Sequence, residues 1–292
     1  MWQIPSDGAA GAVEAELEYL CPSSARPFNY MYPPPDGGPW QNCDYRRATQ
    51  FIRDARGFAG RPSIDGAGFE LWHAPSAVKD FFNSEEVLRV YYPEMAALAL
   101  AASGASRAFV FDHLLRRREP GPPQAFGRRD GARPGAAGRV HCDFTPASAR
   151  RRLALELGVE AGMEAGMDAG RTALAPRRYS IVNLWRSIRH PVLDAPLALC
   201  DARSVAPADL VASDIFYPAR QGEIYQALHN EEQRWWYFSA MTRDEVLVFK
   251  QFDSAPGALA RFTPHAAFAH PHTPAGAPLR ESMEIRCLLM FD

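Results

Sequence analysis

Two residues in the middle of the chain, His141 and Asp143, have the spacing of a pair of metal ligands. On a β-strand, residues i and i+2 point to the same face, so an imidazole nitrogen and a carboxylate oxygen would meet at one point while Cys142 faces away. With one more histidine they would form the triad of two histidines and one carboxylate that holds non-haem Fe(II) and leaves coordination positions open. In the alternative interpretation, His141 ends a strand and Asp143 caps a helix that begins near Pro146, since Thr145-Pro146 is also a favourable helix start.

Several histidines could supply the third ligand. We predict that His265, in the segment FTPH, completes the triad. His270 and His272 compete with it because they also have the i, i+2 spacing, although they lie in a proline-rich loop, where histidines are usually exposed. His229 precedes residues that are typical of a turn. Three further histidines have no partner pattern and are expected to be packing or surface residues: His73, His113 and His190.

The start of the last predicted strand carries residues suited to binding a carboxylate. Arg280 and Ser282 have i, i+2 spacing and therefore share a strand face. A guanidinium can hold a carboxylate through two parallel hydrogen bonds, and a hydroxyl beside it adds another donor. Arg286 lies further along the same face. Taken alone, R-E-S would also fit an arginine–glutamate pair on the surface.

The order H-x-D, then a distal histidine, then R-x-S resembles the site of iron- and 2-oxoglutarate-dependent oxygenases. A 2-oxo dicarboxylic acid chelates iron through its keto-acid end, and its far carboxylate then needs a cationic clamp. This resemblance implies that the triad holds Fe(II) and that Arg280 and Ser282 bind the cosubstrate, with Arg286 as the fallback. Dioxygen would be the other cosubstrate.

Four further side chains are candidates for binding the primary substrate. Arg186 could pair with a substrate carboxylate, although a charge-paired surface arginine is the simpler interpretation. Lys250 lies within the apolar run VLVFKQF and could point into a barrel mouth or extend to solvent. Asn183 shares a strand face with Trp185. Tyr225 could line a pocket, although aromatic side chains in strands more often belong to the core.

The elements that must position these residues are predicted to be mainly β-strands with flanking helices. The alternating residues Val13, Ala15, Leu17 and Tyr19 could line one face of a strand. From Arg178 onwards, turn residues separate six strand-like runs: RYSIVNLWR, PLALCDA, EIYQAL, RWWYF, EVLVFKQF and SMEIRCLLMF. Many short strands with few helices favour a β-sandwich or barrel. The absence of βαβ alternation and of G-x-G-x-x-G after a strand argues against a dinucleotide site.

The first third of the chain and two loops complete the expected organisation. Residues 76–82 and 84–103 are predicted to be helical, with Ser84 as the N-cap of the second helix and Gly104 as its stop. Short strands are expected at 69–72 and 107–112. We read the segments near 119–138 and 158–176 as loops, since GVEAGMEAGMDAG in the second contains too much glycine for a stable helix. We expect a single domain, 1–292, in which strands and helices of 1–106 pack on a core formed by 107–292.

Composition narrows the function classes. The chain has 292 residues, a formal net charge of −2, 23% charged residues and 47% hydrophobic residues, which are values of a globular protein. A near-neutral chain lacks the excess of positive charge that nucleic-acid binding requires, and no apolar run is long enough to span a bilayer. The five cysteines form no C-x-x-C pair and the N-terminus shows no secretory signal pattern, so we expect a cytoplasmic protein with reduced thiols.

Ten segments carry a wider resemblance: LEYL, RDAR, GFEL, YYPE, FDH, VHCDFTP, NLWRSIRHPVLDAPLALCDARSV, MTRDEVLVFKQFDS, TPHAAF and RESMEIR. In these segments and in their order the chain resembles the hydroxylase/desaturase family of fungal and bacterial secondary metabolism that includes the 7-alpha-cephem-methoxylase-related proteins. The resemblance implies a double-stranded β-helix (jelly roll) and Fe(II)- and 2-oxoglutarate-dependent oxidation of an unactivated C–H bond. It also implies that His141, Asp143 and His265 are the iron ligands.

The expected reaction is hydroxylation, desaturation or oxidative cyclisation of a small secondary-metabolite or amino-acid-derived substrate, with no nucleic-acid or membrane partner. Two other classes remain open. One is a non-catalytic jelly-roll protein that binds a ligand, and the other is a Zn-dependent hydrolase with the same metal ligands and an activated water. The R-x-S pair favours the oxygenase, because neither alternative needs a clamp for a dicarboxylate.

Overall fold

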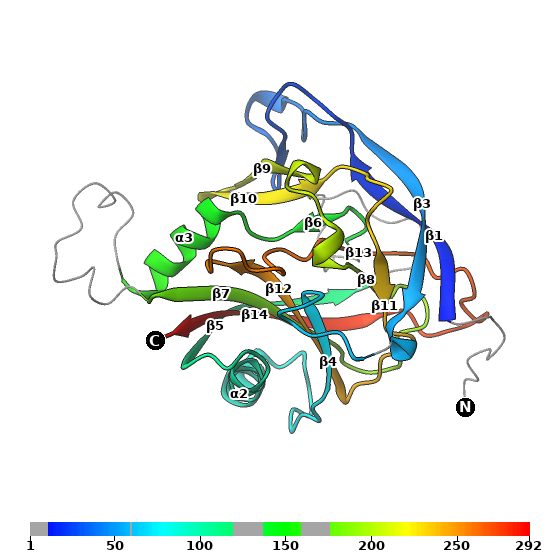
Figure 1. The fold of residues 1–292 in the computed structure, drawn as a ribbon, viewed down its shortest axis with the longest axis vertical. Helices are drawn as coiled ribbons and strands as arrows, with labels where there is room; N and C mark the ends of the chain where they lie inside the picture. Colours follow the sequence, from blue (N-terminus) through cyan, green and yellow to red (C-terminus); the bar gives the residue numbers. More distant parts are fainter. Residues whose placement is uncertain (1–10, 59, 119–136, 159–175) are drawn as a thin grey trace.

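The computed structural model describes residues 11–58, 60–118, 137–158 and 176–292 (Figure 1). Nearly all of the two expected loops, near 119–138 and 158–176, lies outside these ranges. Two β-sheets face each other, and helix α2 covers the outer face of the smaller one (Figure 1). This arrangement confirms the predicted jelly roll.

The larger sheet contains nine strands in the order β1-β3-β11-β8-β13-β6-β10-β9-β2, and the smaller contains five in the order β4-β12-β7-β14-β5. The strands are β1 (Ala12–Leu20), β2 (Phe28–Tyr30), β3 (Tyr45–Asp54), β4 (Phe69–His73), β5 (Arg107–Arg117), β6 (His141–Cys142), β7 (Arg178–Ser187), β8 (Leu197–Cys200), β9 (Leu210–Tyr217), β10 (Arg220–Ala227), β11 (Trp235–Tyr237), β12 (Glu245–Asp253), β13 (His265–Ala267) and β14 (Glu281–Phe291). Strands β1 to β4 belong to the sheets themselves, so the first third of the chain is part of the β architecture rather than a layer on top of it.

Helices are few in the described residues. They are α1 (Ser84–Glu86), the π-helical turn η4 (Val87–Tyr91), α2 (Tyr92–Ser103) and α3 (Pro146–Glu156), with short 3-10 turns at Pro35–Gly37, Ala55–Gly57, Ala202–Ser204 and Pro207–Asp209. None of these helices has both the length and the apolar composition that a membrane crossing requires.

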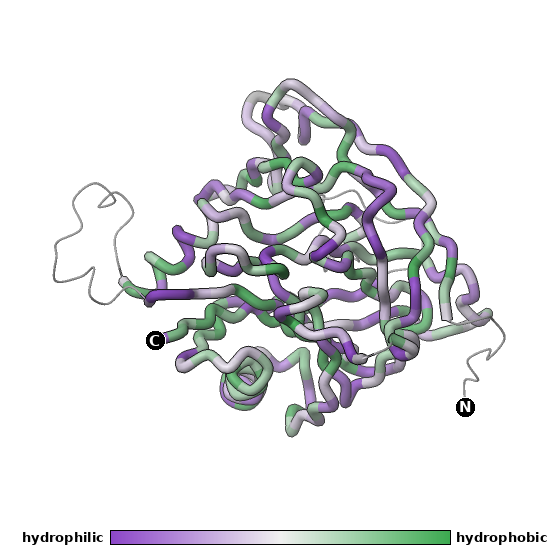
Figure 2. The backbone as a smooth tube through the Cα atoms, viewed as in Figure 1, coloured by the Kyte–Doolittle hydropathy of each residue, from purple (hydrophilic) through white to green (hydrophobic). Residues whose placement is uncertain are grey.

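Strand β7 lies at the centre of the small sheet and is buried on both faces. Val182 and Leu184 belong to the core beneath α2, whereas Trp185 belongs to the core between the two sheets. A strand covered on both faces needs an almost continuous apolar run, which is what the sequence of β7 provides. Hydrophobic stretches accordingly run along α2 and the strands beside it (Figure 2).

The register of the small sheet brings polar groups of neighbouring strands to the inner face. Asn183 of β7 pairs with Arg286 of β14 and with Phe249 of β12, and Trp185 pairs with Glu284. Since paired residues of an antiparallel sheet share a face, Asn183, Glu284 and Arg286 all point to the space between the sheets together with the Trp185 ring. This inner face is the part of the fold that the site uses.

Two expectations about the first third of the chain are wrong. Residues 76–82 are not helical. Their backbone N–H groups bind glutamate side chains in place of the backbone carbonyls of a helix: the Ala77 N–H donates to Glu94 Oε1 at 2.8 Å and the Lys79 N–H to Glu86 Oε1 at 2.8 Å. The cap of the next helix is Asn83, whose Oδ1 accepts the N–H of Glu85, rather than Ser84. The expected stop at the C-terminal end is confirmed, since Gly104 adopts φ 68° and donates to the Leu100 carbonyl.

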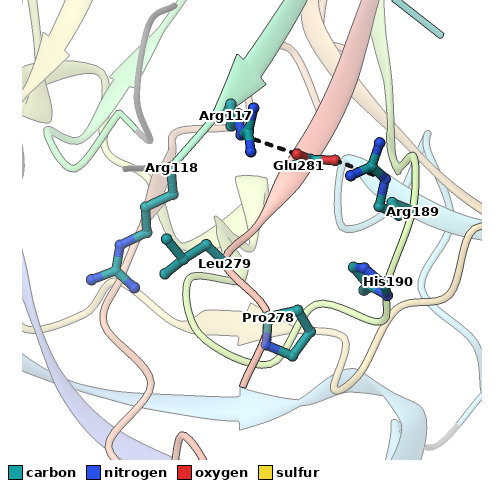
Figure 3. A pocket seen from close by; sticks show the side chains of 7 residues that line it. All are labelled: Arg117, Arg118, Arg189, His190, Pro278, Leu279 and Glu281. Atoms are coloured by element: carbon teal, nitrogen blue, oxygen red, sulfur yellow. Dashed lines mark ion pairs between the residues drawn. The ribbon is translucent and has the colours of Figure 1, made fainter. Parts of the chain in front are cut away.

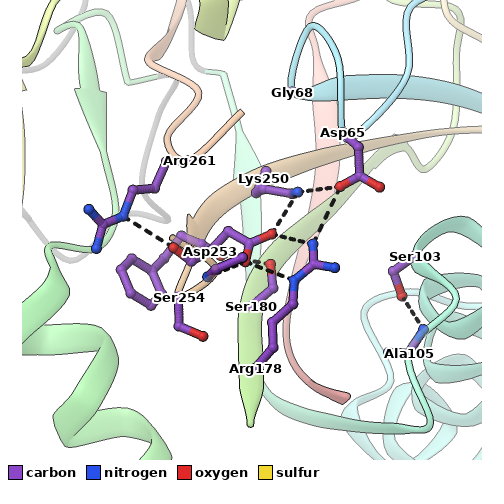
Figure 4. A network of polar contacts seen from close by, with 12 residues as sticks. Asp65, Gly68, Ser103, Ala105, Arg178, Ser180, Lys250, Asp253, Ser254 and Arg261 are labelled. Atoms are coloured by element: carbon purple, nitrogen blue, oxygen red, sulfur yellow. Dashed lines mark hydrogen bonds and ion pairs between the residues drawn. The ribbon is translucent and has the colours of Figure 1, made fainter. Parts of the chain in front are cut away.

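An ion network joins β7, β12 and the segment before β4 (Figure 4). The Lys250 ammonium lies 2.6 Å from Asp65 Oδ1 and 2.9 Å from Asp253 Oδ2, and Arg178 binds both carboxylate oxygens of Asp253 at 3.0 and 2.6 Å. Both Lys250 and Asp253 are almost completely buried. Burial alone would raise the pKa of Asp253, but Arg178 and Lys250 outweigh burial and lower it.

We expect Asp253→Asn to lower the free energy of unfolding by about 3 kcal/mol, because it leaves buried cations without their main partner. The folded-state pKa of Asp253 lies below its ordinary value of 3.8, so its contribution is complete near neutral pH and declines as the pH falls below that value. Urea unfolding at pH 7 and pH 3 measures both effects. Glu16→Gln, which removes an exposed pair with Arg47, is the matched control and should change little. Equal losses for both variants would contradict the assignment.

Candidate metal centre and cosubstrate site

The structure brings the three predicted ligand residues together. His141 of β6 and His265 of β13 are direct partners in the large sheet, and their ring centroids lie 4.4 Å apart. Asp143 follows β6 immediately, and one ligand atom from each of the three residues lies within 4.8 Å of the others. Both imidazoles are buried. This donor set fits a metal that accepts two nitrogens and one carboxylate oxygen.

Backbone carbonyls orient both imidazoles. His141 Nδ1 lies 2.8 Å from the Arg139 carbonyl oxygen, and His265 Nδ1 lies 3.2 Å from that of Thr263. With Nδ1–H donating to the carbonyl, the lone pair of each Nε2 remains for a metal, which is the usual second hydrogen bond of a metal-binding histidine. Burial, helped by the nearby His141, lowers the pKa of His265 to about 3, so its imidazole is in the neutral form that metals require.

The Asp143 carboxylate is held through one of its two oxygens. Its Oδ2 accepts hydrogen bonds from Asn183 Nδ2 at 2.8 Å and from Arg286 Nε at 3.0 Å, whereas its Oδ1 lies 3.5 Å from His141 Nε2. Burial would raise the pKa of Asp143, but the charge of Arg286 and the contact with His141 keep it well below its usual range. The carboxylate is therefore ionised, with Oδ1 directed at the histidines.

Asp143 is not a helix cap. Thr145 caps α3, since its Oγ1 accepts the N–H of Ser148 at 3.1 Å and the Ser148 hydroxyl reaches back to the Thr145 N–H at 2.9 Å. The alternative interpretation of the H-x-D pattern is therefore wrong for Asp143.

Arg286 lies near the middle of β14, beside Asp143, and contacts three carboxylates. Besides Asp143, its guanidinium binds Asp112 Oδ2 at 2.8 Å and Glu284 Oε1 at 3.0 Å. Burial disfavours this charge, yet the three carboxylates raise the pKa of Arg286 above its ordinary value. Burial in turn raises the pKa of Glu284. A guanidinium so fully engaged serves to hold Asp143 in place.

Arg280 and Ser282 differ from Arg286 because their polar atoms have few partners. The Arg280 side chain is buried over the Trp185 ring and donates to the Ala195 carbonyl at 2.7 Å, and no described carboxylate oxygen lies within 4.0 Å of its guanidinium. Burial and the nearby Arg116 lower its pKa to about 10. Ser282 Oγ is buried without a hydrogen-bond partner among the described residues. Unpaired buried donors are costly, so this end of the inner face fits an anionic ligand.

The other predicted site residues take different places. The Asn183 amide donates a hydrogen bond to Asp143 and does not face a substrate space. Arg186 lies on the opposite face of β7, where it donates to the carbonyls of Ala74 and Arg243 at 2.8 and 3.1 Å. Lys250 belongs to the ion network of Figure 4. The half-buried Tyr225 ring lies edge to face with Phe262, 5.1 Å between centroids.

The competing histidines lie outside the triad. His270 Nε2 is 3.2 Å from the Tyr237 hydroxyl, and the His272 ring is 5.9 Å from the His270 ring. His229 packs edge to face against Tyr19 at 5.1 Å.

Three residues of the site escape the motif analysis. Glu284 could have been found, because it has the same i, i+2 spacing as Arg280, Ser282 and Arg286 in RESMEIR. Asp112 is contributed by β5, and Gln251 reaches the Asp143 N–H from β12 at 2.8 Å. No local sequence pattern predicts these two contacts, since both depend on the pairing of strands that are distant in the sequence.

A pocket of about 500 Å³ lies near the start of β14 but contains none of the triad residues (Figure 3). Its lining includes Glu281, which is held between Arg117 Nε at 3.1 Å and Arg189 Nε at 3.3 Å. Leu279 and Glu281 line this pocket, whereas the neighbouring Arg280 guanidinium lies over Trp185, in the core between the sheets. The pocket and the metal centre are therefore separate features.

Known proteins match this chain over almost its whole length. A family model described as "Oxidoreductase/YMDC permease-like domain" matches residues 17–290. The hydroxylase/desaturase efuI of Hormonema carpetanum is 32% identical over 265 residues, which cover 85% of each chain. The Fe(II)/2-oxoglutarate-dependent dioxygenase nvfI of Aspergillus novofumigatus is 36% identical over 292 residues, which cover 94% of this chain and 96% of that protein.

Solved structures agree with these relatives. The iron and alpha-ketoglutarate-dependent endoperoxidase NvfI is 27% identical to this chain with a TM-score of 0.79, and the match covers 96% of this chain and 98% of that one. A second NvfI structure in a different conformation gives a TM-score of 0.80. The chain therefore belongs to the hydroxylase/desaturase family of Fe(II)- and 2-oxoglutarate-dependent oxygenases.

Proposed function

We propose that this protein uses Fe(II), 2-oxoglutarate and O₂ to hydroxylate, desaturate or oxidatively cyclise a small secondary-metabolite or amino-acid-derived substrate. One observation carries the proposal: two oriented imidazoles and a carboxylate converge in the same interior as Arg280 and Ser282, neither of which binds a carboxylate of the described residues. A metal triad alone would suit a hydrolase, but the unpaired clamp suits a dicarboxylate.

Bound iron and 2-oxoglutarate supply the oxidising power, with succinate and CO₂ as the products of the cosubstrate, while the protein positions and shields the reactants. In this proposal His141 Nε2, His265 Nε2 and Asp143 Oδ1 hold the metal. Asn183 and Arg286 occupy Asp143 Oδ2 and so keep Oδ1 available.

The positions of the two arginines along β14 support an orientation for the cosubstrate. Arg286, near the middle of the strand, contacts Asp143 and so lies beside the metal centre, where the keto-acid group would bind. Arg280 and Ser282 lie further along the same inner face, where the distal carboxylate would accept two hydrogen bonds from the guanidinium and one from the hydroxyl.

Among the four candidates for substrate binding, Tyr225 is the one that we retain. Its ring is half-buried beside Phe262, and its strand β10 pairs with β6, the strand that carries His141. The polar groups of Asn183, Arg186 and Lys250 are occupied by protein partners, which supports structural roles for them.

Two further proposals concern the chain as a whole. We propose one oxygenase domain over 1–292, supported by the participation of β1 to β4 in both sheets. We also propose a cytoplasmic location, supported by five cysteines that are all unpaired.

Aerobic incubation with Fe(II), ascorbate and 2-oxoglutarate tests the function through the formation of succinate. We expect slow succinate release without a primary substrate and faster release with one. A Zn-dependent hydrolase or a ligand-binding protein would release none.

For the metal, we expect His141→Ala, Asp143→Ala and His265→Ala each to weaken Fe(II) or Mn(II) binding by more than about a hundredfold, because even changes in residues that only orient ligands cost ten- to hundredfold. Isothermal titration under argon measures the affinity. His270→Ala and His272→Ala are the matched controls and should bind metal normally. If His265→Ala binds normally while either control fails, the loop supplies the third ligand instead.

For the cosubstrate, Arg280→Ala should raise the apparent dissociation constant of 2-oxoglutarate on the order of a hundredfold, because hydrogen bonds to charged groups are worth about 1.5–3 kcal/mol each. Arg280→Lys should recover only part of this, since an ammonium cannot form the paired bonds. The visible charge-transfer band that appears when 2-oxoglutarate is titrated into the anaerobic Fe(II) protein reports binding. Arg286→Ala should weaken metal binding, because Arg286 holds Asp143. If this variant instead loses only the binding of 2-oxoglutarate, Arg286 rather than Arg280 is the clamp.

A further inference from the structure

Strand β12 contains one more residue than its neighbour β7 at the level of the metal centre. Lys250 pairs with Val182, and Phe252 pairs with Ile181, so Gln251 has no partner on β7. Such a β-bulge leaves one residue unpaired and changes the direction of the side chains that follow. As a result Phe252 joins Ile181 in the core cluster on the inner side, and Gln251 beside it also reaches the inner face.

The same bulge brings Lys250 and Asp253 together on the other face. The two residues are three positions apart, yet their charged groups lie 2.9 Å from each other. Arg178 and Asp65 complete the network (Figure 4), and the Lys250 N–H donates to the Gly68 carbonyl at 2.8 Å. The bulge is thus anchored by buried charge on one face while Gln251 extends from the other.

The Gln251 side chain is fully buried and contacts two of the three candidate ligands. Its Oε1 accepts the backbone N–H of Asp143 at 2.8 Å, and its Nε2 lies 3.5 Å from His265 Nδ1. Asp143 follows a strand of only two residues, so this bond from the small sheet fixes its backbone from the opposite side. Gln251 therefore spans the two segments of the large sheet that carry the carboxylate and the distal imidazole.

We propose that Gln251 is a positioning residue that sets the spacing between the Asp143 carboxylate and the His265 imidazole. The bulge in β12 directs the Gln251 side chain toward these two residues. This inference rests on the proposed metal ligands. The amide makes no contact with the metal itself in this proposal and acts only through the two ligand residues. Residues that orient metal ligands typically contribute ten- to hundredfold to metal affinity.

The test uses Gln251→Met, which keeps the length of the side chain and its packing against His265 but removes the acceptor for the Asp143 N–H. Titration with Co(II) under argon gives the affinity, and the visible absorption of bound Co(II) reports the coordination geometry. We expect affinity to fall on the order of tenfold and the Co(II) spectrum to change. Gln251→Glu keeps an acceptor for the Asp143 N–H and should retain a wild-type spectrum.

Gln233→Met is the matched control, because Gln233 is also buried but binds Asp209 and the Leu228 carbonyl, away from the metal centre. It should leave both the affinity and the spectrum unchanged, even where the thermal stability of the two Met variants falls equally. The proposal is overturned if Gln251→Met binds Co(II) like the wild type, or if Gln233→Met changes the spectrum as much.

Two further measurements distinguish a failure of the proposed role of Gln251 from a failure of the proposed metal site. If Gln251→Met does not fold, Gln251→Glu decides alone, since a spectrum far from wild type would contradict the role of the Asp143 bond. His141→Ala is measured alongside. Normal Co(II) binding in that variant would contradict the proposed metal site itself. If His141→Ala loses Co(II) binding while Gln251→Met binds Co(II) like the wild type, only the role of Gln251 is contradicted.

Discussion

The whole site depends on a single carboxylate of one sheet that is held by donors of the other. Asp143 directly follows β6 of the large sheet, whereas the Asn183 amide and the Arg286 guanidinium that bind its Oδ2 belong to the small sheet. Without these donors, burial would favour the protonated carboxyl, which is a poor metal ligand. With them, the group stays ionised and its second oxygen faces the histidines. The same two hydrogen bonds therefore connect the two sheets at the site and keep the carboxylate charged.

The inner face of β14 and the residue before it carry two arginines in different surroundings. Arg286, near the middle of the strand, is surrounded by three carboxylates, whereas Arg280, just before the strand, has none within ion-pair distance among the described residues. In the proposed site, the cosubstrate would therefore meet a compensated cation beside the metal ligands and an uncompensated one at its far end. The family indicates the identity of the cosubstrate, and the contrast between the two arginines supports the orientation that we propose for it.

Local patterns predict a large part of this molecule because alternation along a strand is a property of the sequence itself. The H-x-D and R-x-S spacings and the alternating face of β1 are of this kind, and Val13, Leu17 and Tyr19 are indeed buried. Contacts between strands are not predictable in this way. The unpaired residue Gln251 interrupts the alternation in β12, so the faces of Gln251 and of the residues after it could not be read from the sequence. Residues 76–82 likewise lose their helix to Glu86 and Glu94, which lie in the following helical segment.

The Arg280 guanidinium, which has no carboxylate within ion-pair distance among the described residues, has a consequence for the protein without its cosubstrate. Burial of this cation raises the free energy of the folded state, and the buried Ser282 hydroxyl adds to that cost. A dianion that satisfies both groups binds only the folded chain, so it stabilises that chain in proportion to the logarithm of its free concentration. The proposed cosubstrate would therefore act as a stabilising ligand as well as a reactant, and the protein without it would be the less stable form.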